Sequence, residues 1–160
     1  ETHDYKLGLE CSEITVADRA LLERVVLEAP VHAATRSKTV LLVDDDYEFV
    51  QAMKVRFQSV GFHVLTATEG VEALQKSRTE HPHLIILDLM LPKLNGYEIC
   101  RLLKFDQKFQ HIPIIMLSAR ARQQDRELGL SAGADAYVTK PFDGQALFET
   151  VETVLAKSPR

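Results

Sequence analysis

Residues 40–46 read VLLVDDD, so that four aliphatic residues run directly into three aspartates. A short apolar run rich in β-branched residues is typical of a strand covered on both faces, as in a parallel sheet. Apolar runs that end at a polar residue recur at 84–88 (LIILD) and 114–118 (IIMLS). These stretches predict buried strands over 40–43, 84–87 and 114–117.

Helical patterns alternate with these strands along the chain. We expect helices over 47–60, 70–80, 97–105, 123–131 and 144–156, and further strands over 63–67 and 136–138. Gly61 is expected to cap the first of these helices, and Val71, Leu74 and Ser77 to share one face of the second. Strands and helices that alternate with short connections predict an α/β fold, a doubly wound five-stranded parallel sheet with helices on both faces.

The start of the chain has a different character, and we expect residues 1–37 to form an N-terminal extension to a domain over 38–160. Residues 14–29 predict one amphipathic helix, because Leu21, Leu22, Val25, Val26 and Ala29 form an apolar stripe. Pro30 ends this helix, and a linker follows. The helix could close an upstream domain, support a homodimer or pack on the main domain, and since the chain opens on Glu1 it could be a fragment.

Composition excludes several classes of protein. The chain has 160 residues, 46% of them hydrophobic, which is enough to bury a core. A net charge of −4 argues against direct nucleic-acid binding and against a polybasic membrane surface. From the sequence we expect no membrane-spanning segment and no leader peptide. The two cysteines, Cys11 and Cys100, offer neither a disulfide framework nor a metal knuckle. We therefore expect a cytoplasmic protein.

Polar side chains stand at the predicted carboxyl ends of four strands: Asp44, Asp45 and Asp46, then Asp88, Ser118 and Lys140. A single polar residue after a strand usually caps the next helix or faces water. Side chains that converge from four strands instead predict a site, because ligands of open α/β sheets bind at this edge.

The chemistry of these residues favours Mg²⁺ and a phosphoryl group. Close carboxylates repel one another unless a cation lies among them, and hard oxygen ligands suit Mg²⁺. Asp45 and Asp88 are expected to be direct ligands, with Asp44 orienting a metal-bound water. Lys140 and the Ser118 hydroxyl would then surround a phosphoryl group. No glycine-rich phosphate loop follows the first strand, which argues against nucleotide and flavin binding.

The chain resembles the receiver domain of two-component response regulators, the CheY-like fold, over about residues 38–157. The motifs that carry the resemblance are VLLVDDD (40–46), LDLMLPKLNG (87–96), IMLSA (115–119), GADAY (133–137) and TKPF (139–142). All of them occur in the family's order, and most stand at a predicted strand end.

The resemblance assigns roles to individual residues. It implies that Asp88 is the phosphoacceptor, that Lys140 contacts the phosphoryl group, and that Ser118 and Tyr137 form the switch. It also implies that Asp44, Asp45, Asp88 and the backbone carbonyl of Met90 serve Mg²⁺, and that the bond before Pro141 is cis. Asp46 fits better as a helix N-cap.

These roles describe a signalling module and not an enzyme, since the domain catalyses only its own phosphorylation and dephosphorylation. The expected partners are a sensor histidine kinase or a histidine phosphotransfer protein, and a downstream protein or an effector domain outside this chain. Met90 and Arg120 are expected to slow hydrolysis of the phosphoryl group by their bulk.

Two alternatives use parts of the same pattern. A Mg²⁺-dependent phosphatase of the haloacid dehalogenase type also has an aspartyl nucleophile, but it needs an Asp two residues later, where this chain has Met90. An unphosphorylated interaction module, or pseudo-receiver, normally lacks an acid or the lysine, whereas Asp44, Asp45, Asp88 and Lys140 are all present here.

Overall fold

A computed structural model describes residues 38–158 of the chain. The predicted extension over 1–37 and its helix over 14–29 lie outside these residues. The described part is a five-stranded parallel sheet in the order β2-β1-β3-β4-β5, as the sequence predicts. Its strands are β1 (Thr39–Val43), β2 (His63–Ala67), β3 (Leu84–Asp88), β4 (Ile114–Ser118) and β5 (Ala136–Thr139).

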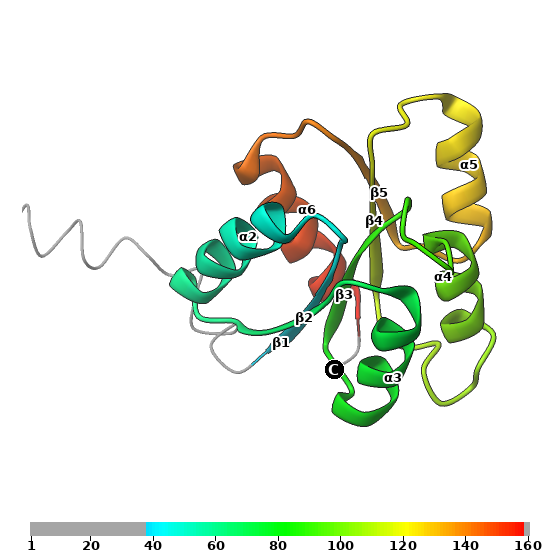
Figure 1. Cartoon of the computed structure of the whole chain (residues 1–160), viewed down its shortest axis with the longest axis horizontal. Helices are drawn as coiled ribbons and strands as arrows, with labels where there is room; N and C mark the ends of the chain where they lie inside the picture. Colours follow the sequence, from blue (N-terminus) through cyan, green and yellow to red (C-terminus); the bar gives the residue numbers. More distant parts are fainter. Residues whose placement is uncertain (1–37, 159–160) are drawn as a thin grey trace, which may run out of the picture. The chain divides into compact units, whose positions relative to one another are not determined.

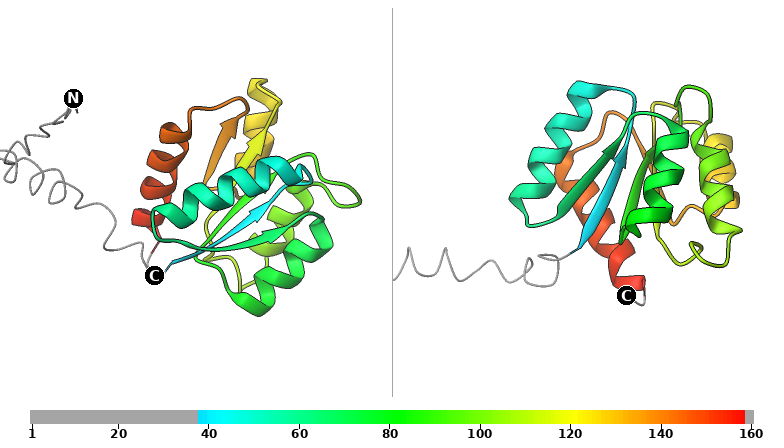
Figure 2. Two further views of the ribbon diagram at one scale, coloured as in Figure 1. Left: turned by 60° about the vertical axis from the view of Figure 1, so that its left-hand side comes forward. Right: turned by 60° about the horizontal axis from the view of Figure 1, so that its bottom comes forward.

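Five described helices cover the two faces of the sheet (Figures 1 and 2). They are α2 (Tyr47–Ser59), α3 (Gly70–Glu80), α4 (Gly96–Lys104), α5 (Gln123–Ser131) and α6 (Gly144–Lys157). Alternate residues of β1 point to opposite faces of the sheet and pack against the helices on each face. Val40 and Leu42 pack in one core cluster with residues of α2 and α6, and Leu41 and Val43 in another with residues of α3 and α4.

The central strands are buried along their length, which is why they read as continuous apolar runs. Every residue of β3 and β4 is buried, including Asp88 and Ser118. These two strands are therefore one residue longer than predicted, because their polar ends remain paired, with Asp88 opposite Leu117 and Ser118 opposite Thr139. The polar ends are thus held rigidly at one edge of the sheet.

Helix ends and faces differ from the prediction in small ways. Val60 caps α2, and Gly61 follows with a φ of 95°, a conformation that glycine adopts without strain. In α3, Ser77 is buried but Val71 is 59% exposed, so these residues do not share one face. None of the described helices is both long and apolar enough to cross a membrane.

Candidate functional site

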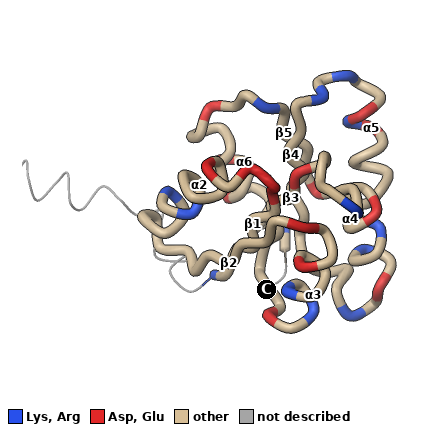
Figure 3. Tube along the Cα trace, viewed as in Figure 1, with Lys and Arg blue, Asp and Glu red and all other residues tan. Residues whose placement is uncertain are grey.

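An acidic cluster lies where β1 and β3 end. One carboxylate oxygen from each of Asp44, Asp45 and Asp88 lies within 4.8 Å of the others. The two strands are neighbours in the sheet, which brings their ends together, and Figure 3 shows the acidic segment after β1 beside the end of β3. Asp44 and Asp88 are buried and Asp45 is exposed. The cluster is therefore open on one side.

Asp46, the third aspartate of the run, has a structural role. Its carboxylate accepts a hydrogen bond of 3.1 Å from the Phe49 backbone N–H, as an N-cap of α2 does. It does not belong to the acidic cluster. The structure thus supports the helix-cap interpretation over a metal role for this residue.

Lys140, which directly follows β5, brings a positive charge to the cluster. Its Nζ lies 2.5 Å from Asp44 Oδ2 and 3.0 Å from Asp88 Oδ1. Burial by itself lowers the pKa of this ammonium, but the hydrogen bonds to Asp44 and Asp88 outweigh it and raise the pKa above the ordinary value. Lys140 is therefore a permanent cation at neutral pH. It precedes a cis bond to Pro141, as the family resemblance implies.

Asp44 shows the cost of placing carboxylates in this site. Burial raises its pKa above the ordinary value for an aspartate, although the hydrogen bonds from Lys140 and from the Asp46 backbone partly oppose that rise. Asp44 Oδ1 accepts from the Asp46 N–H at 3.0 Å, which orients the carboxylate. A further cation in the site would relieve the same desolvation cost.

The residues present fit a divalent cation. Three carboxylates and one ammonium have a formal net charge of −2, which one Mg²⁺ ion would neutralise. Mg²⁺ prefers hard oxygen ligands at about 2.0–2.1 Å and keeps several waters, and the exposed side of the cluster leaves room for water. Asp44, Asp45 and Asp88 are the side chains that could hold it.

The backbone around Asp88 is tightly arranged. Asp88 Oδ2 accepts a hydrogen bond of 2.8 Å from the Met90 N–H, so both of its carboxylate oxygens have partners. Gly96, the first residue of α4, lies so close that a Cβ there would be 2.6 Å from the Asp88 carbonyl oxygen. The Met90 side chain is 53% exposed, and its carbonyl as a metal ligand stays a prediction.

The backbone of Arg120 joins the two predicted switch residues. The Ser118 hydroxyl oxygen accepts from the Arg120 N–H at 3.0 Å, and the buried Tyr137 donates from its hydroxyl to the Arg120 carbonyl at 3.0 Å. Ser118 is buried at the end of β4, one strand away from Asp88. The Arg120 guanidinium lies 3.7 Å from Asp125 of α5, so the side chain extends toward that helix.

Sequence reasoning missed one neighbour of the site, Phe49. The centre of its ring lies 4.5 Å from Lys140 Nζ, a cation–π distance. The same ring packs edge to face with Phe142, with 6.1 Å between the ring centres. Phe49 lies in α2, and Lys140 and Phe142 stand more than ninety residues later. No local spacing in the sequence signals this contact.

Comparison with known proteins agrees with this geometry. The family model for the response regulator receiver domain matches residues 40–152. The alkaline phosphatase synthesis transcriptional regulatory protein PhoP of Bacillus subtilis is 43% identical over 122 residues, 76% of this chain and 50% of that protein. The chain spans about half the length of the curated relatives it matches.

Solved structures carry the same fold. The receiver domain of the Francisella response regulator 1452 is 32% identical with a TM-score of 0.70, covering 75% of this chain and 98% of that one. The receiver domain of the sensor histidine kinase PA1611 from Pseudomonas aeruginosa is 29% identical with a TM-score of 0.70, covering 76% and 99%. That structure has a magnesium ion coordinated in its active-site cleft.

Proposed function

This chain belongs to the response regulator receiver family, and from this premise we propose that it accepts a phosphoryl group on Asp88 with the help of Mg²⁺. The observation that carries the proposal is the meeting of Asp44, Asp45, Asp88 and Lys140 at one edge of the sheet. Receiver domains bind Mg²⁺ at an acidic site, and the acidic cluster of this chain supports the same role here. Signal transduction, and not turnover of an external substrate, is then its task.

In the proposed reaction, an oxygen of the Asp88 carboxylate attacks the phosphorus of a phosphohistidine. The new P–O bond forms as the P–N bond breaks, and the imidazole leaves with the electron pair and takes up a proton. Bound Mg²⁺ supplies charge neutralisation for the phosphoryl oxygens. Lys140 exchanges its contact with Asp88 for a phosphoryl oxygen, which it can do because its ammonium already lies 3.0 Å from that carboxylate.

The proposed switch runs through the Arg120 peptide group. A phosphoryl group on Asp88 offers the Ser118 hydroxyl a stronger acceptor, so we expect the hydroxyl to turn toward it and leave the Arg120 N–H. Tyr137 is coupled to the same peptide through the Arg120 carbonyl. Movement of this loop would then release Tyr137 and change the face formed by α5, β5 and α6, as a shift between two populations.

Met90 and Arg120 are proposed to prolong the life of the phosphoryl group by hindering attacking water. Both follow a site residue by two positions and both side chains are exposed. We expect faster decay of the phosphorylated protein for Met90→Ala and Arg120→Ala, with Arg122→Ala, an exposed neighbour, as the control. Unchanged or slower decay in the first two variants would refute this role.

The proposed partners are a histidine kinase or phosphotransfer protein on the input side and a downstream protein or effector domain on the output side. A domain over 38–160 that carries this chemistry, with an extension over 1–37, remains our proposed organisation, as does a cytoplasmic location. The longer relatives include proteins named as transcriptional regulators, which makes transcription one output to examine.

Intact mass after incubation with acetyl phosphate and Mg²⁺ tests the proposal. We expect one added phosphoryl group, lost in Asp88→Asn and in excess EDTA but kept in Asp46→Asn. Asp46→Asn is the matched control, because Asn also caps helices and Asp46 lies outside the acidic cluster. Absence of an adduct in the unaltered chain would contradict the proposal and favour a pseudo-receiver.

A further inference from the structure

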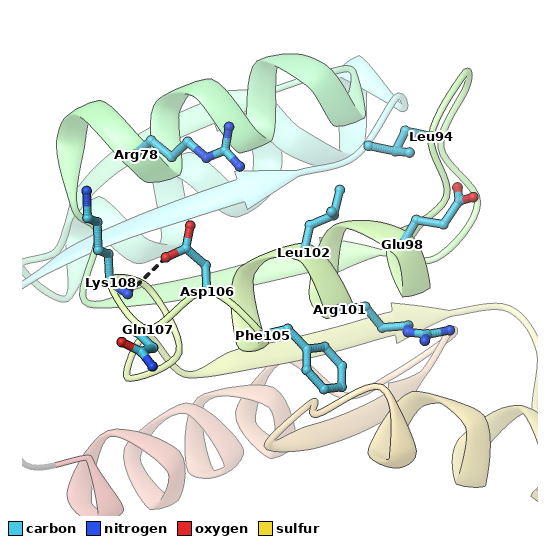
Figure 4. Close-up of a pocket in the computed structure, with 9 residues that line it drawn as sticks. All are labelled: Arg78, Leu94, Glu98, Arg101, Leu102, Phe105, Asp106, Gln107 and Lys108. Atoms are coloured by element: carbon cyan, nitrogen blue, oxygen red, sulfur yellow. Dashed lines mark hydrogen bonds between the residues drawn. The ribbon is translucent and has the colours of Figure 1, made fainter.

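A groove runs between α3 and α4, away from the acidic site. Its volume is about 1040 Å³. Leu94, Leu102 and Phe105 supply its apolar lining, and Arg78, Arg101 and Lys108 supply its cations. Figure 4 shows Leu102 pointing from α4 toward α3, with Arg78 on the α3 side. The groove follows α4, whose nine residues span about 14 Å.

The apolar residues of this groove are unusually exposed. Phe105 is 77% exposed and Leu102 is 47% exposed. Phe105 and Arg101 also line a second, smaller groove toward α5, where Leu128 is 56% exposed. Apolar side chains that gather in this way on a surface mark interaction sites more often than single exposed residues do.

The acidic side chains around the groove have hydrogen-bond partners, whereas the basic ones have no acidic partner among the described residues. The carboxylate of Glu98 accepts from the Asn95 N–H, and that of Asp106 accepts from the Lys108 N–H. Within residues 38–158, by contrast, no carboxylate forms an ion pair with Arg78, Arg101 or Lys108. Arg101 instead lies 6.0 Å from the centre of the Phe105 ring. The lining therefore carries three cations against two carboxylates that already have backbone partners, beside exposed apolar side chains.

We propose that this groove binds an acidic amphipathic helix of a partner protein. Such a helix places aliphatic residues against Leu102 and Phe105 and carboxylates against Arg78, Arg101 and Lys108. The length of α4 suits a partner helix of two to three turns, at about 5.4 Å per turn. A nucleic acid fits less well, because phosphate contacts dominate nucleic-acid binding and the leucine and phenylalanine side chains of the groove offer none. The inference does not depend on phosphorylation of Asp88.

Fluorescence anisotropy with a labelled synthetic helix tests the groove in the full chain. The probe carries leucines on one face and glutamates beside them, and a matched probe carries lysines in place of the glutamates. We expect the glutamate probe to bind at least about tenfold more tightly than the lysine probe, and salt to weaken it. We also expect Phe105→Ser and Leu102→Ser to weaken it at least about tenfold.

Control variants separate the groove from general surface effects. Leu130→Ser removes another exposed leucine, and Lys157→Glu reverses an exposed cation on α6. Both should bind the glutamate probe like the unaltered chain, whereas Arg78→Glu and Arg101→Glu should lose binding at least about tenfold without a change in melting temperature. Equal binding of the two probes, or equal losses in Leu130→Ser and Phe105→Ser, would overturn the proposal. So would a dimer in sedimentation that Phe105→Ser dissociates, since a second copy would then be the occupant.

Discussion

The ammonium of Lys140 has two kinds of neighbour in the site. The carboxylates of Asp44 and Asp88 hold it by charge, and the ring of Phe49 covers it from α2. A cation over an aromatic ring gains about 0.5–1 kcal/mol at exposed sites and more when water is excluded. Phe49 therefore helps to keep the ammonium in the cluster.

Replacement of Phe49 tests this contact directly. The Lys140 side chain lies close to the ring, so we expect ring-current shifts of its ε-methylene resonances in NMR spectra. Phe49→Leu should move these resonances toward the values of an exposed lysine, while Phe49→Tyr should retain them. Identical Lys140 resonances in Phe49→Leu and the unaltered chain would show that the contact is absent in solution.

The burial of Cys100 predicts how its thiol reacts at mildly alkaline pH. The thiol is fully buried in α4, and burial raises its pKa from 9.0 to about 12. A thiol alkylating reagent at pH 8 should therefore not modify Cys100 in a folded Cys11→Ser variant, and should modify it after denaturation. Modification of the folded variant as fast as the unfolded one would contradict the burial of Cys100.

The same shift affects stability at high pH. As pH rises, the folded state keeps the Cys100 proton to a higher pH than the unfolded state does. The contribution of the protonated thiol to the free energy of unfolding is therefore fully present below pH 9 and is lost as pH rises toward about 12. The free energy of unfolding should fall less steeply above pH 9 in Cys100→Ala than in the unaltered chain. Urea titrations at several pH values measure the difference, and parallel slopes would contradict the prediction.

Among the elements, the strands were predictable and their long-range contacts were not. The apolar runs at 40–43, 84–87 and 114–117 determine buried parallel strands, and a polar residue that follows such a run must lie at the ligand-binding edge. The sequence therefore predicts Asp44, Asp45, Asp88 and Lys140 together, as the structure has them. It does not predict that Asp88 and Ser118 are the last paired residues of β3 and β4, because that depends on pairing with neighbouring strands.

Four of the five helix starts are confirmed, and only the start of α4 differs from the prediction, by one residue. Helix α4 begins at Gly96 and not at Tyr97, because Asn95 is its N-cap and forms a capping box with Glu98 in the first turn. The close approach of Gly96 to Asp88 comes from tertiary packing, and the sequence offers only the glycine itself as a signal. Phe49 offers no local signal at all.

Gly96 and Gly144 allow a matched comparison of glycine-to-alanine substitutions, since each is the first residue of its helix. A Cβ at Gly96 would lie 2.6 Å from the Asp88 carbonyl oxygen, whereas the three atoms nearest a Cβ at Gly144 all belong to the guanidinium of Arg56, an exposed side chain that can move. We expect Gly96→Ala to lower the free energy of unfolding by about 1–3 kcal/mol and to reduce phosphorylation. Gly144→Ala should be neutral or stabilising by about 0.4–1 kcal/mol. Urea denaturation measures both, and equal effects would contradict the account of Gly96.

For the whole molecule, we expect the acidic site to couple metal binding to folding. The buried carboxylates of Asp44 and Asp88 meet in the folded chain, where their ends of β1 and β3 lie side by side. An ion that binds this folded arrangement in preference to the unfolded chain stabilises it in proportion to the logarithm of ion concentration. The stability of the chain should therefore report on the site without any measurement of phosphorylation.

We expect the melting temperature to rise with Mg²⁺ concentration in the unaltered chain and in Asp46→Asn, and to respond much less in Asp45→Asn. Asp45 is the exposed member of the cluster, so its replacement should preserve the fold. Addition of EDTA should reverse the rise. A response in Asp45→Asn equal to that of Asp46→Asn would show that Mg²⁺ acts elsewhere on the protein.

Chemical trapping can locate the acyl phosphate that we expect Asp88 to form. Borohydride reduces an aspartyl phosphate to homoserine, which peptide mass spectrometry assigns to one position. After treatment with acetyl phosphate and Mg²⁺, we expect homoserine at position 88, dependent on Mg²⁺ and absent without the phosphoryl donor. Reduction at Asp44 or Asp45 instead, or at no aspartate, would contradict this prediction.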